Sequence, residues 1–138
     1  MTHTYQHRVR FRECDPMGIV YHVHYLDWFE VARTEALREL GVSYKSIEAA
    51  GTILPVTGLH AKYHLPARYD DEVLVETTCH LSQSGVRIRF EYEVKRKVDN
   101  ALLVEGSVSL CFFDRGRSRP TPAPQRVIDV LRGESQSP

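Results

Sequence analysis

Residues 86–95 read Val-Arg-Ile-Arg-Phe-Glu-Tyr-Glu-Val-Lys and carry the clearest pattern in the chain. Apolar and aromatic side chains alternate with charged ones without interruption, which is the period of a β-strand with one buried and one solvated face. Asp99-Asn100 then supplies a hairpin turn, and a second alternating run follows at residues 104–112. These residues therefore predict two antiparallel strands.

The same alternation marks three further strands, at residues 5–11, 59–65 and 73–81. Between the first of them and the rest, residues 25–40 place apolar side chains at spacings of three and four, which predicts a long helix that ends at Gly41. Ser43 can cap a short second helix that Gly51 ends. The element order predicts an α+β fold in which an antiparallel sheet of about five strands packs on one long helix.

The length of 138 residues fits a single domain, which we place at residues 1–132, followed by a polar C-terminal tail at 133–138. One helix covers a long sheet poorly, and the other face of residues 87–93 is charged. We therefore expect this sheet to pair edge to edge or face to face with a second copy of the chain.

Composition excludes several functional classes. Eighteen Lys and Arg balance eighteen Asp and Glu, so no global field favours nucleic acid. Apolar runs are far shorter than the ~20 residues of a spanning helix, so we expect no membrane insertion. Three widely spaced cysteines and no signal-peptide pattern predict a reduced, cytoplasmic protein. Motifs of serine hydrolases, P-loops, dinucleotide folds and zinc proteases are absent from the sequence.

The residues with the most chemical potential lie between the first strand and the long helix, in Glu13-Cys-Asp-Pro-Met-Gly-Ile-Val-Tyr-His-Val-His-Tyr25. Asp15 precedes Pro16 and Gly18 and has two interpretations. It can bond its own backbone in an Asx turn. Alternatively, its carboxylate can face the N-terminus of the helix, whose free N–H groups suit an oxyanion. The second arrangement is typical of acyl transfer.

These residues, together with Ala32-Arg-Thr-Glu35 and residues 62–71, resemble the hotdog-fold acyl-CoA thioesterases. Within that family the chain is similar to the branch with 4-hydroxybenzoyl-CoA thioesterase and the short-chain acyl-CoA thioesterases associated with the Tol–Pal system. The resemblance covers nearly the whole domain. It implies the hotdog fold, with the sheet wrapped around the helix, and an active site at a subunit interface, hence a homodimer or homotetramer.

The resemblance also implies roles for individual residues. Asp15 is the catalytic carboxylate, as nucleophile or general base, and the backbone N–H at His22 polarises the thioester carbonyl. We expect further substrate contacts from four side chains: Tyr21, Tyr63, Arg87 and Arg89. Coenzyme A enters as part of the substrate, and we expect no cofactor. His22 and His24 alone make a weak metal site, so we expect no metal.

Some alternatives stay open at this point. The motif around Asp15 is similar to the hydroxybenzoyl type, whereas Tyr21-His22 is similar to the short-chain type, so both aromatic and short acyl groups are candidates. The carrier can be an acyl carrier protein instead of coenzyme A, and hydratase or dehydratase chemistry is a weaker option. The chain can also be a non-catalytic acyl-CoA binding domain. Glu30 and Glu35 on the helix are the fallback carboxylates.

Overall fold

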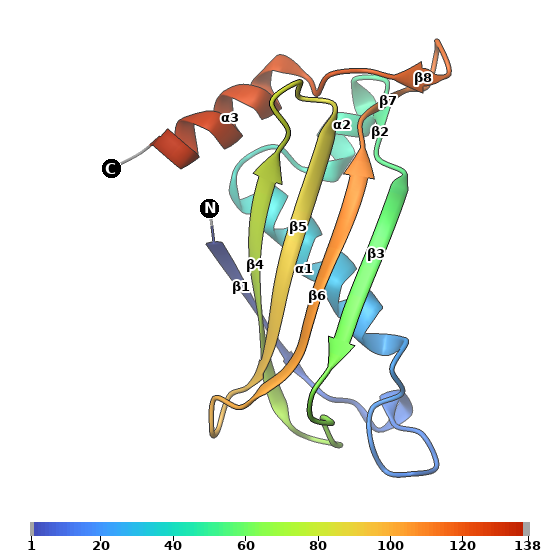
Figure 1. Cartoon of the computed structure of the whole chain (residues 1–138), viewed down its shortest axis with the longest axis vertical. Coiled ribbons are helices and arrows are strands. Elements are labelled where there is room, and N and C mark those ends of the chain that lie inside the picture. Colours follow the sequence, from blue (N-terminus) through green and yellow to red (C-terminus); the bar gives the residue numbers. More distant parts are fainter. Residues whose placement is uncertain (1, 137–138) are drawn as a thin grey trace.

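The computed structural model describes the backbone of residues 2–136 and the side chains of residues 2–133. Five strands form one sheet in the order β1-β4-β5-β6-β3 (Figure 1). Their bounds are Thr2–Arg8 for β1, Glu72–Leu81 for β4, Arg87–Arg96 for β5, Leu102–Cys111 for β6 and Val56–Tyr63 for β3. All neighbouring pairs are antiparallel, which confirms the predicted sheet of about five strands.

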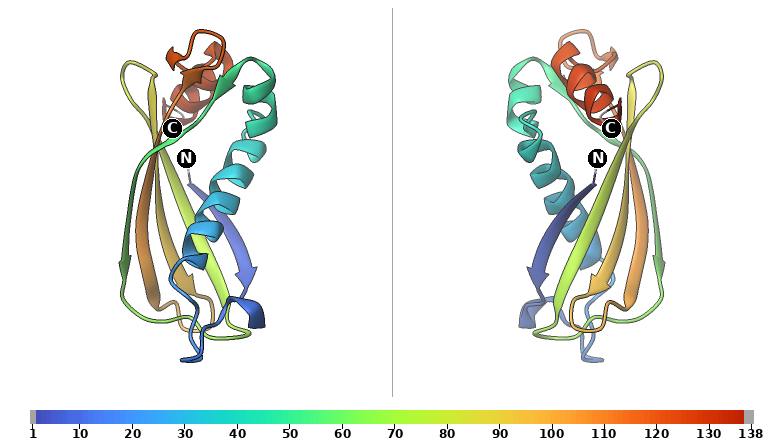
Figure 2. Two further views of the ribbon diagram at one scale, coloured as in Figure 1. Left: turned by 90° about the vertical axis from the view of Figure 1, so that its right-hand side faces the viewer. Right: turned by 90° about the vertical axis from the view of Figure 1, so that its left-hand side faces the viewer.

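Helix α1 (His24–Glu39) lies against one face of this sheet (Figure 2). Its buried residues recur at spacings of three and four, as the sequence predicts: Tyr25, Trp28, Phe29, Ala32, Arg33, Ala36 and Leu37. The chain leaves α1 through Gly41, which has a φ of 83° that a side chain would strain. Ser43 then accepts a hydrogen bond from the Ser46 N–H and caps α2 (Tyr44–Ala49), which confirms the second predicted helix.

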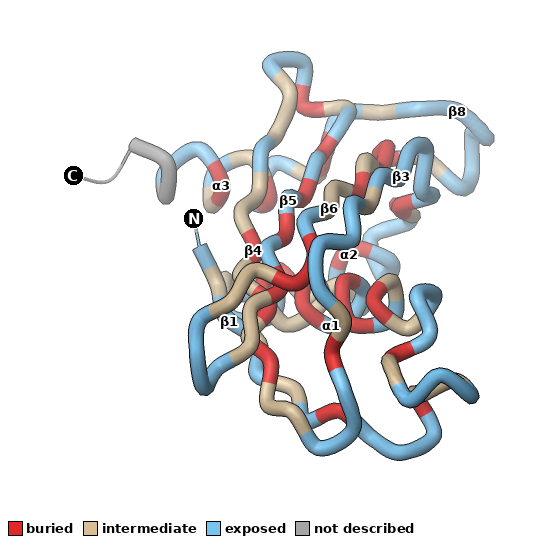
Figure 3. The backbone as a smooth tube through the Cα atoms, turned by 60° about the horizontal axis from the view of Figure 1, so that its bottom comes forward, coloured by how far each residue is buried: buried red, intermediate tan, exposed pale blue. Residues whose placement is uncertain are grey.

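The two faces of β5 differ as its alternation predicts. Four residues are buried on the side of α1: Ile88, Phe90, Tyr92 and Val94. The charged residues between them are exposed on the outer face. Buried residues gather on the elements around α1, while the outer turns of the molecule are exposed (Figure 3).

Over Gly106 in β6, the ring of Phe29 on α1 lies directly against the backbone of the sheet. A Cβ placed on Gly106 would lie 2.6 Å from the ring of Phe29, which is closer than atoms pack. The Phe29 ring in turn stacks on Tyr92, with centroids 4.2 Å apart and an interplanar angle of 6°. The missing side chain at Gly106 therefore lets the helix sit directly on the backbone of the sheet.

Strand β3 differs from the other strands because both of its faces are open in the single chain. Leu59 and Tyr63 pair in register with the buried Val108 and Val104, so they point to the side of α1. Even so, Leu59 is 53% exposed and Tyr63 is 46% exposed. Strand β3 is one of the two edge strands of this sheet, so it has a partner strand on one side only. One apolar edge of the sheet is therefore uncovered.

Some regions differ from the sequence-based expectation. The first strand ends at Arg8 rather than Phe11, because β4 begins at its register partner Glu72 and offers no further pairing. Phe11 instead begins the short 3-10 helix η1 (Phe11–Glu13). In addition, three two-residue strands form a small second sheet that alternation over longer windows cannot reveal: β2 (Thr52–Ile53), β7 (Phe113–Asp114) and β8 (Arg119–Pro120).

The C-terminal helix α3 (Gln125–Gln136) is longer than the last turn or two that the sequence indicates. It includes residues 133–136, which we assigned to a polar tail, and residues 137–138 lie outside the described part of the chain. Within residues 2–136, no helix is both long and apolar enough to span a membrane.

Candidate active site

The segment that carries Asp15 folds into a tight loop between β1 and α1. Cys14 and Val20 pair across its base in an antiparallel bridge. The Asp15 N–H donates to the Ile19 carbonyl at 2.8 Å, and the Gly18 N–H donates to the Asp15 carbonyl at 2.9 Å. Gly18 has a φ of 79°, which explains why the turn needs glycine there. The backbone of the loop thus holds Asp15 in one place.

The Asp15 side chain is half-buried and makes one hydrogen bond. Its Oδ1 accepts from the Met17 N–H at 2.8 Å, so the Asx turn that the sequence allows is formed. The second carboxylate oxygen has no hydrogen-bond partner among the residues that the structure describes. The turn and a chemical role are therefore compatible, because the turn occupies one oxygen and leaves the other for a ligand.

Helix α1 begins without a side-chain cap. Val23 occupies the N-cap position, and His24 turns its ring to Asp27, with Nδ1 3.1 Å from Oδ2. The backbone N–H groups of His22 and Val23 find no acceptor within residues 2–136. A helix start with open N–H groups and the positive end of the dipole is suited to hold a negative oxygen. The N–H of His22, predicted as the oxyanion donor, is therefore free to act.

A pocket of about 250 Å³ lies beside this helix start. It is lined by Ile19, Val20, His22, Tyr25, Tyr63, His64, Leu65 and Pro66. Most of these side chains are apolar or aromatic, which suits an acyl group. Two predicted site residues, His22 and Tyr63, share this wall. Asp15 does not line the pocket itself, but its N–H bonds to Ile19, which does.

Two tyrosines fix the wall of the pocket. The Tyr63 hydroxyl donates to the His22 carbonyl at 3.2 Å, and the Tyr25 hydroxyl accepts from the Ala67 N–H at 3.0 Å. The two rings are 5.6 Å apart between centroids. Burial raises the pKa of both hydroxyls above the usual value of 10.0, so both stay protonated at neutral pH. The Tyr63 bond places one predicted substrate-binding residue next to His22.

The other predicted substrate-binding residues lie at different distances from the pocket. The Tyr21 ring contacts the His22 ring at 4.7 Å, beside the pocket. Arg87 and Arg89 lie far from the pocket. Tyr63 pairs with Val104, which in turn pairs with Val94 on β5. Arg87 precedes Val94 by seven residues, which corresponds to about 23 Å along the strand. Within one chain, the structure therefore does not bring the arginines to Asp15 and His22.

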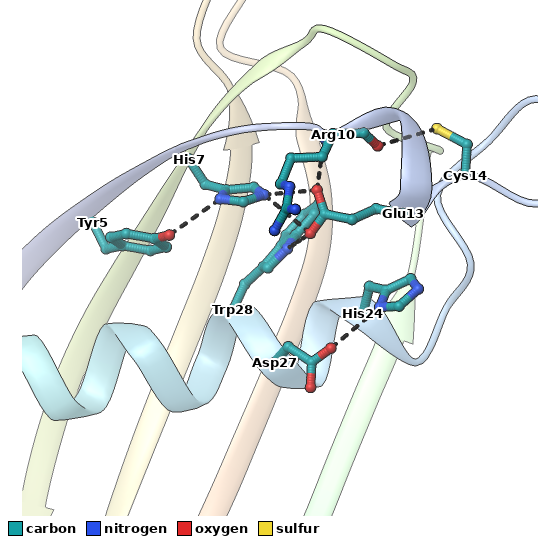
Figure 4. Close-up of polar contacts among 8 residues, drawn as sticks. All are labelled: Tyr5, His7, Arg10, Glu13, Cys14, His24, Asp27 and Trp28. Carbon is teal, nitrogen blue, oxygen red and sulfur yellow. Dashed lines mark hydrogen bonds and ion pairs between the residues drawn. The ribbon is translucent and has the colours of Figure 1, made fainter.

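Beneath the loop lies a buried carboxylate that the sequence analysis did not single out. Glu13 is 8% exposed and lies between β1 and α1 (Figure 4). Its Oε1 accepts from the Arg10 N–H at 2.7 Å and lies 2.9 Å from Nε2 of His7. Its Oε2 accepts from the Trp28 indole N–H at 2.7 Å. The Tyr5 hydroxyl lies 3.1 Å from the other ring nitrogen of His7. One carboxylate thus joins three segments of the chain.

The environment of Glu13 keeps it charged. Burial alone would raise its pKa, but hydrogen bonds from the Arg10 N–H, His7 and Trp28 outweigh it and lower the pKa below the usual 4.5. An ionised carboxylate only accepts hydrogen bonds, so His7 carries its proton on Nε2. A signal was present in the sequence: His7 stands on the face of the first strand that also carries Tyr5 and Val9, where a histidine needs a partner.

Other candidates do not gather at the pocket. Burial, followed by the charges of Glu13 and Asp15, raises the pKa of Cys14, so this thiol is a poor nucleophile at neutral pH. Glu30 is exposed on α1, and Glu35 pairs with Arg38, so neither fallback carboxylate lines the pocket. In residues 2–136, no three His, Cys, Asp or Glu side chains form a group that could hold a metal.

Comparisons with known proteins agree on one family. Residues 9–131 match the family model of the thioesterase-like superfamily. Acyl-CoA thioester hydrolase YbgC of Escherichia coli is 30% identical over 121 residues, which cover 88% of this chain and 89% of the relative. Acyl-CoA thioesterase YbgC of Haemophilus influenzae is 33% identical over 121 residues, or 87% of each chain.

Solved structures give the same result for the fold. A 1,4-dihydroxy-2-naphthoyl-CoA thioesterase from Synechocystis superposes with a TM-score of 0.90 at 22% identity, covering 99% of this chain and 100% of the other. DHNA-CoA thioesterase from Staphylococcus aureus gives a TM-score of 0.84 at 28% identity, covering 99% and 97%. The hotdog fold that the resemblance implies is confirmed.

Proposed function

Because the chain belongs to the thioesterase-like superfamily and is a thioester hydrolase, we propose that it hydrolyses acyl-CoA to a free acid and coenzyme A. One observation carries this proposal beyond the family. The uncapped start of α1 leaves the His22 N–H open beside an apolar pocket, on the same short loop as Asp15. A carboxylate and an oxyanion donor are the two groups that thioester hydrolysis needs.

In the proposed reaction the thioester carbonyl oxygen accepts a hydrogen bond from the His22 N–H. The free oxygen of Asp15 then either attacks the carbonyl carbon, forming an anhydride that water opens, or takes a proton from an attacking water. Negative charge that develops on the carbonyl oxygen is held by the helix start. The thiolate leaves without a strong acid, since thiols have pKa values of about 8.5.

The acyl group is proposed to enter the pocket between Ile19, Tyr25 and Tyr63. A wall of aromatic rings and branched side chains favours an aromatic or short acyl chain over a charged one. Among the similar structures, two are thioesterases of 1,4-dihydroxy-2-naphthoyl-CoA, an aromatic acyl-CoA. An acyl group on a carrier protein and a non-catalytic role in binding acyl-CoA remain the alternatives.

A second copy of the chain is part of the proposal. The β3 edge is open, and Leu59, Tyr63 and Leu65 are each about half exposed beside the pocket. Antiparallel pairing of two β3 edges would relate the two copies by a two-fold rotation, so that opposite ends of the two β3 strands lie side by side. The end of the second copy's sheet that carries Arg87 and Arg89 would then lie next to the end of β3 that borders the pocket, with both arginines on the outer face of the joined sheet. In such a homodimer, or a homotetramer built from it, these cations are proposed to bind coenzyme A phosphates only where the substrate extends past the sheet edge.

We further propose that the enzyme works in the cytoplasm and needs no metal or cofactor, since coenzyme A enters only with the substrate. A carboxylate and backbone N–H groups suffice for the proposed chemistry. Dialysis against a strong chelator should therefore leave turnover unchanged. Loss of activity that Zn²⁺ or Mg²⁺ restores would contradict this part of the proposal.

Thiol release from short, long and aromatic acyl-CoAs tests the function. We expect turnover of at least one substrate, and a loss of at least about a hundredfold in Asp15→Ala and Asp15→Asn, as for removal of a nucleophile or base. Asp129→Asn on α3 is the matched control, because within the described part of the chain the Asp129 side chain bonds only to Gln125 of its own helix. A protein that binds acyl-CoA tightly without turnover would instead be a binding domain.

A further inference from the structure

We propose that Glu13 is a positioning residue: its buried carboxylate fixes the loop that carries Asp15 and the N–H of His22. The kinetic test of this role rests on the proposed function, because it measures turnover. The hydrogen bonds around Glu13 support the role independently, because they join both ends of the loop to the body of the fold.

The side chain of Glu13 holds three segments at one point. His7 comes from β1, the Arg10 N–H from the turn that follows, and Trp28 from the second turn of α1. Three N–H groups converge on two oxygens at 2.7–2.9 Å. Charge-assisted hydrogen bonds of this kind are about twice as strong as neutral ones, so the junction is stiff.

The backbone of Glu13 holds the loop itself. Its carbonyl accepts a hydrogen bond from the Tyr21 N–H at 2.9 Å, so the two ends of the loop meet at this residue. Asp15 lies just after Glu13 in the sequence, and His22 directly follows Tyr21. A shift of Glu13 therefore moves the carboxylate and the oxyanion donor relative to α1.

An aromatic path connects the same junction to the pocket. The Trp28 ring packs edge-on against Tyr25 at 4.8 Å, and Tyr25 packs on Tyr63 at 5.6 Å. Tyr63 then donates to the His22 carbonyl at 3.2 Å. The bond between Glu13 and Trp28 thus holds the first of three rings that end at the helix start. Loop and pocket wall share one anchor.

Glu13→Gln is the sharpest variant because it keeps the size of the side chain and changes only its bonding. Gln has one acceptor oxygen, and its NH₂ group would face one of the three N–H donors. Trp28→Phe is a second, milder variant that removes one donor and keeps a ring in place. Leu37→Ala serves as the control: Leu37 is buried near the far end of α1 and does not line the pocket.

Steady-state kinetics at a temperature where all variants are folded gives the first readout. We expect kcat to fall at least about tenfold in Glu13→Gln with KM changed less than about threefold, since small misplacements of catalytic groups are costly. Trp28→Phe should show a smaller loss in the same direction. The double variant should be no worse than Glu13→Gln, because both changes break one junction. Leu37→Ala should retain the kcat of the unchanged protein.

Amide hydrogen exchange gives a readout that needs no turnover. In Glu13→Gln we expect the N–H groups of Asp15, Val20 and Tyr21 to exchange at least about tenfold faster, while those of β5 keep their rates. If the loop amides exchange as before and kcat falls no more than in Leu37→Ala, Glu13 has no positioning role. If the protein without substitutions showed no turnover, the proposed function would be wrong. The hydrogen-exchange measurement would still decide whether Glu13 positions the loop.

Discussion

Two parts of the interior are both buried but are held together in different ways. Along β5, Phe90 and Val94 pack in the apolar core, and each is at most 1% exposed. At the root of the loop, Glu13 is 8% exposed and is held by three hydrogen bonds to its charge. The first contact tolerates small movements, while the second depends on direction and protonation. Stability comes mainly from the first region, and accurate placement of the candidate site comes from the second.

The largest effect is expected in the apolar region. Phe90→Ala should lower the free energy of unfolding by about 3–5 kcal/mol, because a buried ring is replaced by a cavity. Urea unfolding followed by circular dichroism measures the change. The loss should be the same at pH 7 and pH 5, because the substitution removes only apolar surface from the core. A loss below about 1 kcal/mol would mean that the sheet repacks.

At the loop root the expected loss is smaller. Glu13→Gln should lower the free energy of unfolding by about 2 kcal/mol at pH 7, the usual range for a hydrogen bond to a charged group. The same urea titration measures it. Equal losses in Glu13→Gln and Phe90→Ala would remove the distinction between the two regions.

At acid pH, the difference in the free energy of unfolding between the protein without substitutions and Glu13→Gln should become smaller. The pKa of Glu13 is lowered in the folded state from the usual 4.5, so the unfolded chain binds this proton more readily. Its contribution is therefore complete above the unfolded pKa and lost as the pH falls through the folded one. Urea midpoints of both proteins between pH 7 and pH 3 measure the gap. A gap that stays constant to pH 3 would show that the charge of Glu13 contributes nothing.

The smallest loss of stability is expected from removing an exposed hydrogen bond. Ser43→Ala removes the cap of α2, whose Oγ accepts from the Ser46 N–H at 3.2 Å. Stability should fall by about 1 kcal/mol, typical of an N-cap, with turnover unchanged. Thermal unfolding measures the shift, and a change in kcat would show that α2 communicates with the candidate site.

The fold could be predicted from the sequence to the extent that its core is apolar. The alternation of residues 86–95 and the spacing of residues 25–40 placed β5 and α1, because burial of apolar side chains leaves a period in the sequence. The two-residue strands of the second sheet leave no such period, and neither does the extension of α3 through residues 133–136.

The candidate site divides along the same line. The position of Asp15 in a tight turn and the helix start after His22 followed from local motifs. The junction at Glu13 did not, since His7, Glu13 and Trp28 come together only through the packing of β1 on α1. The separation of Arg87 from the pocket likewise depends on strand order, which one-dimensional patterns leave open.

The contact between Phe29 and Gly106 also limits how the gene can change. Every missense change of a glycine codon introduces a Cβ, and at position 106 that atom would lie 2.6 Å from the Phe29 ring. The ring is buried and stacked on Tyr92, so it has no free space into which to turn. Mutational drift is therefore blocked at Gly106 by shape alone, even though this residue does not line the candidate acyl pocket. A substitution there requires an earlier change at Phe29 that makes room for it.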